Sequence, residues 1–206
     1  MALESLHDLY VSQLQDLYSA ETQILDALPL MIEASSHDEL RQGFELHHRQ
    51  TQEQARRLER ILRALGEEPG AETCEGMKGL IAEGRKTMRQ RADSDVLDAA
   101  LIAAAQRIEH YEIAGYGCAR TYAQALGRSD DASVLQQTLD EEAQTDATLT
   151  EVAESVVNPD AQRAGRSAER DVTRRAQQGD QQPPGRRPGS SPRDQSGRSP
   201  DAPPRS

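Results

Sequence analysis

The feature that most constrains the fold of this chain is the spacing of its apolar residues, which follows the period of an α-helix over four long stretches. The alternation of polar and apolar residues that is typical of a strand is absent from the sequence. The helical period predicts four long helices and one shorter one, and their ranges are 3–34, 39–65, 94–126 and 131–157 for the long helices and 75–91 for the short one. We therefore expect an all-α fold.

The connections between these stretches predict how the helices pair. The breaks around Ser35 and Gly127 are short, and short links join antiparallel neighbours in helical bundles. Residues 70–93 form one long crossover that contains the shorter helix. Four long helices with a single long crossover have the connectivity of ferritin-like bundles. The expected fold is thus a ferritin-like antiparallel four-helix bundle.

The end of the chain differs from the rest in composition. Seven of its ten prolines lie between Pro183 and Pro204, and Val172 is the one large apolar residue after residue 157. Such a segment buries too little apolar surface to offset the entropy of ordering it. We expect a folded domain over residues 1–158 and a disordered tail, rich in Arg, Pro, Ser and Gly, over residues 159–206.

Charge excludes some classes of partner. Residues 1–157 carry 14 Lys and Arg against 29 Asp and Glu, a net charge of −15, which argues against specific binding of nucleic acid. No apolar run approaches the roughly 20 residues that span a bilayer, and the first residues lack the pattern of a secretory signal. Cys74 and Cys118 form no disulfide framework or metal-type spacing. A cytoplasmic protein without a membrane segment is expected.

Acidic residues stand where the apolar pattern requires large apolar side chains. Glu112 follows Leu101 and Ile108 on one helical stripe, and Glu109 lies one turn away from it. The other three long helices carry polar residues at equivalent positions, namely Glu21, His47, Gln50, Glu142 and Asp146. A faint repeat between the two halves of the chain places all of them at one level in the middle of the bundle.

Several carboxylates that converge in a dry interior need cations to remain ionised. Carboxylates with an imidazole are the usual donors for iron or manganese in helical bundles. We therefore predict one or two iron or manganese ions per chain, with Glu21 and Glu112 as bridging ligands. The terminal or supporting groups would be Glu109, Glu142, Asp146 and His47, with Gln50 offering a neutral oxygen.

Two other hypotheses compete with a metal protein. A single inward glutamate is more often a paired or hydrogen-bonded side chain than a ligand, so the chain could be a metal-free helical interaction protein. A storage cage is not expected, since a cage needs a further helix or specific assembly surfaces. The sequence leaves open whether the protein has catalytic turnover.

Four stretches carry a family resemblance, and they are D-L-Y-S-A-E-T-Q-I-L at 16–25, C-E-G-M-K-G-L-I-A-E-G at 74–84, D-A-A-L-I-A-A-A-Q-R-I-E-H-Y-E-I-A-G-Y-G at 98–117 and T-L-D-E-E-A-Q-T-D-A-T-L-T at 138–150. On these motifs the chain resembles the YciE/YciF family of ferritin-like stress proteins. The resemblance implies a ferritin-like bundle, a homodimer, and a bacterial role in osmotic or oxidative stress. It identifies no partner protein and no settled reaction.

The resemblance also bears on the predicted site. The family pattern has acidic residues at the five carboxylate positions named above, and His47 matches it as well. The chain departs from the family at Arg49 and Gln50, where a pair of glutamates is common. Loss of a negative charge there weakens one metal position, so a single-metal or asymmetric site becomes an alternative to a two-metal centre.

Overall fold

The computed structural model of the chain describes residues 3–166 and residue 170. Every regular element in this part of the chain is helical. The elements are α1 (Leu6–Ala34), α2 (Asp38–Ala64), α3 (Glu75–Met88), α4 (Ser94–Ala125), α5 (Ser129–Val152) and the π-helical turn η1 (Ala153–Val157).

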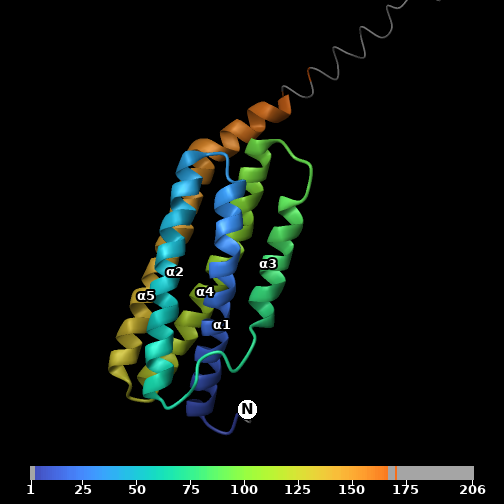
Figure 1. Cartoon of the computed structure of the whole chain (residues 1–206). Coiled ribbons are helices and arrows are strands. Elements are labelled where there is room, and N and C mark those ends of the chain that lie inside the picture. The colour runs from blue at the N-terminus through green and yellow to red at the C-terminus, as the bar shows by residue number, and fades with distance from the viewer. Residues whose placement is uncertain (1–2, 167–169, 171–206) are drawn as a thin grey trace, which may run out of the picture. The chain divides into compact units, whose positions relative to one another are not determined.

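The four long helices lie side by side and form a bundle (Figure 1). The helices α1 and α2 form one antiparallel hairpin, and α4 and α5 form the other. The short helix α3 lies outside the bundle, where it packs against α1 and α4. The predicted all-α bundle with a helix in its long crossover is confirmed.

Local sequence signals set the ends of most helices. The hydroxyl of Ser5 accepts a hydrogen bond from the backbone N–H of Asp8 (3.1 Å), which satisfies one free donor at the start of α1. Gly66 and Gly127 follow α2 and α4 with φ angles of 82° and 72°. This left-handed conformation favours glycine and ends a helix. The two hairpins therefore begin and end close to their predicted boundaries.

The turn that precedes α2 is held by a residue of another helix. The carboxylate of Asp98, on α4 and fully buried, accepts hydrogen bonds from the backbone N–H groups of Ser36 (3.0 Å) and His37 (2.9 Å). The N-cap residue His37 makes no side-chain capping bond of its own. Asp98 thus fastens the α1–α2 turn to α4 and fixes the two hairpins relative to one another at this end of the bundle.

The last helix continues beyond its predicted end. We expected it to stop at Val157, before Asn158 and Pro159, but residues 158–166 are helical as well. A proline ring inside a regular α-helix clashes with the carbonyl four residues earlier. Here the wider π-helical turn η1, closed by a bond from Asn158 N–H to the carbonyl of Ala153, comes just before Pro159 and provides room. The domain boundary at residue 158 stays a prediction.

The apolar core of the part of the chain that the structure describes consists of two separate clusters. One contains Ile24, Met31, Phe44, Leu101 and Leu149 with their neighbours. The other, toward the opposite end of the bundle, contains residues such as Leu14, Leu17, Leu58, Tyr116 and Leu135. Between the two clusters, each long helix contributes polar side chains to the interior.

Candidate metal centre

The polar layer between the two apolar clusters is built by the long helices. The helix α2 supplies His47, α4 supplies Glu109 and Glu112, and α5 supplies Glu142. Glu109 and Glu112 are three residues apart, so their side chains leave the same face of α4. All four side chains are buried, with at most 2 % of each residue exposed. We call these four residues the buried group.

The buried group has the geometry of a ligand set. Each member offers one ligand atom, and these atoms all lie within 4.8 Å of one another. The imidazole of His47 lies between two carboxyl groups, with Nε2 3.3 Å from Glu109 Oε1 and Nδ1 3.9 Å from Glu142 Oε2. One nitrogen and several carboxylate oxygens around a common point suit iron, manganese or zinc.

The protein environment disfavours charge on every member of the group. Burial raises the pKa of Glu109 and Glu112 well above the usual value, and the charges of neighbouring carboxyl groups act in the same direction. Burial likewise raises the pKa of Glu142 to about 7 and lowers the pKa of His47 to about 4. Burial thus acts against the charged form of both His47 and Glu109, which lie 3.3 Å apart.

Most polar atoms of the buried group have no hydrogen-bond partner among the described residues. These atoms include both nitrogens of His47, both oxygens of Glu112, both oxygens of Glu142 and Oε2 of Glu109. A buried polar group without a partner costs about 1–3 kcal/mol. Such a cost, repeated on four adjacent side chains, is offset where the free lone pairs bind a cation. The donor set therefore fits a divalent metal.

Glu21 adds a fourth carboxyl group next to the buried group. It is fully buried on α1, and its Oε1 accepts a hydrogen bond from the hydroxyl of Tyr116, while its Oε2 has no partner. Burial raises the pKa of Glu21 well above its usual value, and the charge of Glu142 adds to the effect. The structure thus brings Glu21 close to the group, although its oxygens are not part of the set within 4.8 Å.

Two more of the predicted site residues, besides Glu21, lie outside the buried group. Asp146 is half-buried on α5 and accepts a hydrogen bond from Gln106 Nε2 (3.1 Å). Gln50 is half-buried on α2 and lines a shallow groove between α2 and α5 together with Gln144. Each is about one turn away from a member of the group, so helical spacing alone did not separate them from it.

Sequence reasoning missed a polar network beside the site. Arg57 donates two hydrogen bonds to the carboxylate of Glu141, at 2.6 Å and 2.9 Å, and a third to the hydroxyl of Thr138 at 3.1 Å. The amide of Gln54 also donates to Glu141. Glu141 directly precedes Glu142 in the sequence. Two adjacent acids cannot both face the interior of a bundle, and this was the one signal that Glu141 needed a partner of its own.

The chain matches the family described as Domain of unknown function (DUF892) over residues 5–162. It is 38 % identical over 163 residues to protein YciF of Escherichia coli strain K12, and the match covers 79 % of this chain and 98 % of YciF. The crystal structure of YciF, a stress protein, superposes with a TM-score of 0.72 over 75 % of this chain and 98 % of that one.

A second solved structure is also similar. YcfI of Rhodopseudomonas palustris, for which a structural role has been suggested, shares 40 % identity and a TM-score of 0.70, covering 72 % of this chain and 94 % of its own. A protein of Xanthomonas campestris at 22 % identity and a TM-score of 0.63 shares the fold.

Within the described residues, no helix combines the length and apolar character needed to cross a membrane.

Proposed function

Because the chain belongs to the DUF892 family together with the stress protein YciF, we propose that it is a bacterial stress-response protein that binds one or two iron or manganese ions inside its bundle. The observation that carries the proposal is the buried group, whose ligand atoms lie within 4.8 Å of one another and mostly lack hydrogen-bond partners. Iron or manganese bound there would supply redox chemistry toward oxygen or peroxide.

The side chains of the buried group and Glu21 would divide between two ions. His47, Glu109, Glu112 and Glu142 would bind the first ion, and Glu21 would bind a second ion shared with Glu112. Tyr116 holds Glu21 by its hydroxyl group, which fixes the orientation of that carboxyl. The first ion would have one imidazole and three carboxyl ligands, whereas the second would have Glu21 and a share of Glu112, so we expect unequal affinities for the two ions. Oxidation of ferrous iron as a substrate, or consumption of peroxide, is the activity that we propose for such a site.

Substitution of Glu112 by Gln tests the proposal. The full chain, purified gently from cells grown with iron and manganese, should contain one or two ions per chain by elemental analysis. The Glu112→Gln variant should lose most of this metal and the stability that binding confers on the native state. The conservative Asp140→Asn variant, an exposed acid on α5, should retain its metal and serves as the control.

A metal-free helical protein is the second candidate, and the neutral forms favoured in the buried group support it. Protonated carboxyl groups and a neutral imidazole can remain in a dry interior without a cation. The suggested structural role of YcfI also agrees with this candidate. In this case Glu112→Gln would have the same metal content as the wild type, and its stability would be unchanged or higher. A wild-type protein with far less than one ion per chain would favour this second function.

We also propose a homodimer in the cytoplasm. The sequence resemblance supports the homodimer, and the two free cysteines, Cys74 and Cys118, agree with a cytoplasmic location. Light scattering coupled to size-exclusion chromatography would distinguish a dimer from a monomer or a large cage.

A further inference from the structure

The buried group is closed to solvent, so an ion can reach it only by passing between helices. His47 and Glu109 have side chains that are 2 % exposed, and Glu112 and Glu142 are fully buried. Each contact between two helices around the group is therefore a possible route. The polar side chains that line each of these contacts differ in charge and in hydrogen bonding.

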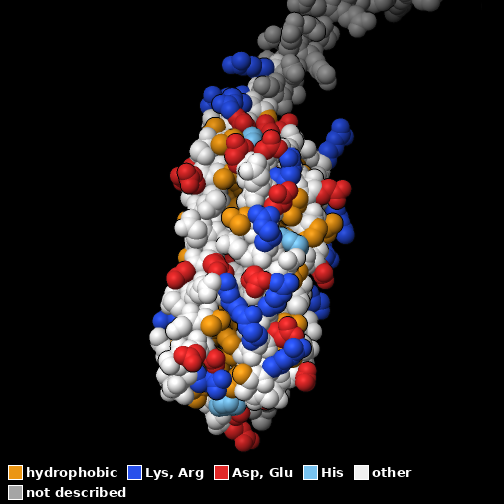
Figure 2. Space-filling model, turned by 60° about the vertical axis from the view of Figure 1, so that its left-hand side comes forward, with side chains coloured by type: hydrophobic (Ala, Val, Ile, Leu, Met, Phe, Trp, Pro, Cys, Tyr) orange, Lys and Arg blue, Asp and Glu red, His pale blue; other side chains and the backbone are white. Residues whose placement is uncertain are grey.

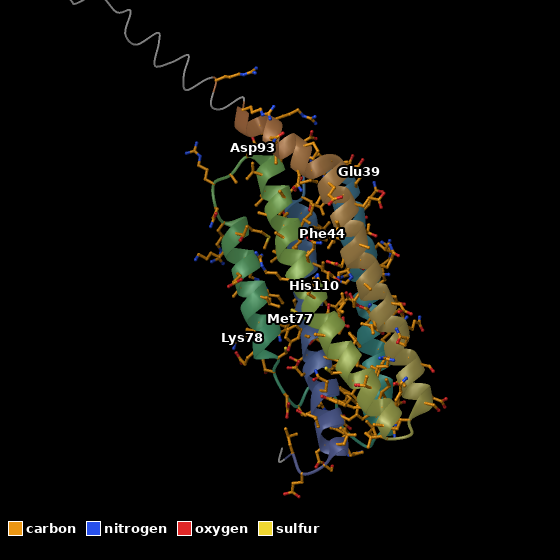
Figure 3. All side chains as sticks on the ribbon, turned by 180° about the vertical axis from the view of Figure 1, so that it is seen from behind. Glu39, Phe44, Met77, Lys78, Asp93 and His110 are labelled. Carbon is orange, nitrogen blue, oxygen red and sulfur yellow. The ribbon has the colours of Figure 1, made fainter. Side chains whose placement is uncertain are left out.

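Side chains that can bind a metal lie along the contact between α4 and α5, and their exposure to solvent falls from the surface toward the buried group. His110, on α4, has a side chain that is 68 % exposed, and its Nε2 lies 3.5 Å from Oδ1 of Asp146 on α5. The Asp146 side chain is 23 % exposed. One turn away from Asp146 is Glu142, and next to His110 in the chain is Glu109. Figure 3 labels His110 on α4, in the view in which α4 and α5 lie in front of the other long helices.

Several observations connect Asp146 with the interior. Asp146 lies four residues after Glu142 on α5, so both side chains leave the same face of that helix. Oε2 of Glu109 and both oxygens of Glu142 are buried and have no partner among the described residues. An ion held at Asp146 therefore meets free acceptor atoms in its next step inward.

The contact between α2 and α5 is unsuitable for a cation. Arg57 lies there and holds Glu141 with two hydrogen bonds, and the amide of Gln54 donates to the same carboxylate. An ion entering here would have to displace the guanidinium from a carboxylate that it already holds with two charge-assisted hydrogen bonds. Figure 2 shows Lys and Arg side chains gathered midway along this face.

The side covered by α3 is also closed. The hydroxyl of Tyr111 donates to Asp16 Oδ2 at 2.7 Å and lies 2.9 Å from the sulfur of Cys74, which is fully buried. Gly76 lies so close to this tyrosine that an added Cβ would stand 2.8 Å from its ring. A hydrated ion would have to break these contacts.

We propose that Asp146 and His110 form an outer site, which takes up a divalent cation from solvent and passes it between α4 and α5 to the buried group. This inference rests on the proposed metal-binding function and adds the route by which that site is loaded. An imidazole and a carboxylate are a donor pair for Fe²⁺, Mn²⁺ and Co²⁺. Gln106, which donates a hydrogen bond to Asp146, fixes the carboxylate beside the imidazole.

The route can be tested by the rate at which the metal-free full-length chain takes up Co²⁺. Stopped-flow absorbance follows the d–d bands of bound Co²⁺, and elemental analysis gives the final stoichiometry. Asp146→Asn keeps the size of the side chain and its ability to accept from Gln106, but removes the charge. We expect Asp146→Asn to slow uptake by about tenfold and to leave the final stoichiometry unchanged.

Two further variants complete the experiment. Asp140→Asn removes an equal charge from the exposed surface of the same helix and should leave the rate within about twofold of wild type, since the screened field of a distant charge is weak. His110→Gln, at an exposed position, should slow uptake in the same direction as Asp146→Asn. Circular dichroism would verify that each variant is folded.

The outcomes separate this inference from the function on which it rests. If the wild-type chain binds Co²⁺ and Asp146→Asn binds it at the same rate, the outer site is refuted while the metal centre remains. If Asp146→Asn lowers the stoichiometry instead of the rate, Asp146 is a ligand of the final site, and the route is again refuted. If the wild-type chain binds no Co²⁺, both proposals fail together.

Discussion

Glu142 shows how a single side chain links folding, protons and metal. Its carboxyl group is fully buried, and burial raises its pKa from 4.5 to about 7. Near neutral pH the folded protein therefore holds this proton more strongly than the unfolded chain does. Metal binding requires the opposite, because a carboxylate must lose its proton before it binds a cation. Stability without metal and affinity for metal are thus expected to change in opposite directions with pH.

The pH dependence of the free energy of unfolding tests the raised pKa of Glu142. A carboxyl group whose pKa is raised by folding stabilises the protein at low pH, and this stabilisation is lost as pH rises through the folded-state pKa. The lowered pKa of His47 makes the free energy of unfolding rise with pH, but only between about pH 4 and pH 6.5. From pH 6.5 to about 8, the free energy of unfolding of the metal-free protein should therefore fall by about 1 kcal/mol for Glu142 alone.

Urea unfolding of the chelator-treated protein at a series of pH values measures this effect. Glu142→Gln carries no titrating group at this position and should show a smaller slope above pH 6.5. The Asp140→Asn variant should keep the wild-type slope. A wild-type free energy of unfolding that rises with pH across this window would show that the buried carboxyl groups are not protonated in the metal-free bundle.

At the scale of elements, the crossover depends on a polar stripe along α1. Gln15, Ser19 and Gln23 are each four residues apart and share one face of the helix. The amide of Gln15 donates to the carbonyl of Glu68 and accepts from the N–H of Gly70. Ser19 Oγ accepts from the N–H of Cys74, and Gln23 donates to the carbonyl of the same residue. These bonds hold the chain against α1 just before α3 begins.

Two glycines of α3 give opposite predictions. An added Cβ at Gly76 would lie 2.8 Å from a ring carbon of Tyr111, whereas one at Gly79 would have no neighbour within 4 Å. Gly76→Ala should therefore destabilise the protein by about 1–3 kcal/mol through overpacking. Gly79→Ala should stabilise it by about 0.5–1 kcal/mol, since alanine is the better helix former. Thermal unfolding of the two variants, measured in parallel, would contradict this packing of α3 if both changes had the same sign.

At the scale of the whole molecule, apolar spacing and loop lengths were sufficient to predict the bundle. The same spacing identified Glu21 and Glu112, because a carboxyl group on an apolar stripe is conspicuous. Asp146 occupies an equally conspicuous position, and its separation from the buried group depends on how α5 is rotated about its axis, which the sequence does not specify.

The contacts that join distant parts of the chain could not be predicted either. The carboxylate of Asp98 caps a turn about 60 residues earlier in the chain, and Arg57 pairs with Glu141 across the bundle. An arginine and a glutamate on polar helix faces look like ordinary surface residues until the packing of α2 against α5 is known. Long-range polar pairs of this kind carry no local signal in a single sequence.

The C-terminal end of the folded domain can be located by truncating the chain. We predicted a boundary after residue 158, yet residues 158–166 are helical, and Asp160 Oδ2 lies 3.7 Å from Nε2 of His37 at the α1–α2 turn. A chain truncated after residue 157 should lose this contact and unfold at a temperature a few degrees lower. A chain truncated after residue 166 should keep the wild-type melting temperature and metal content, because the contacts of the bundle described above all lie within residues 3–166. Equal melting temperatures for the two truncated chains would support the boundary at residue 158, and a lower value for both would show that residues 167–206 contribute to stability.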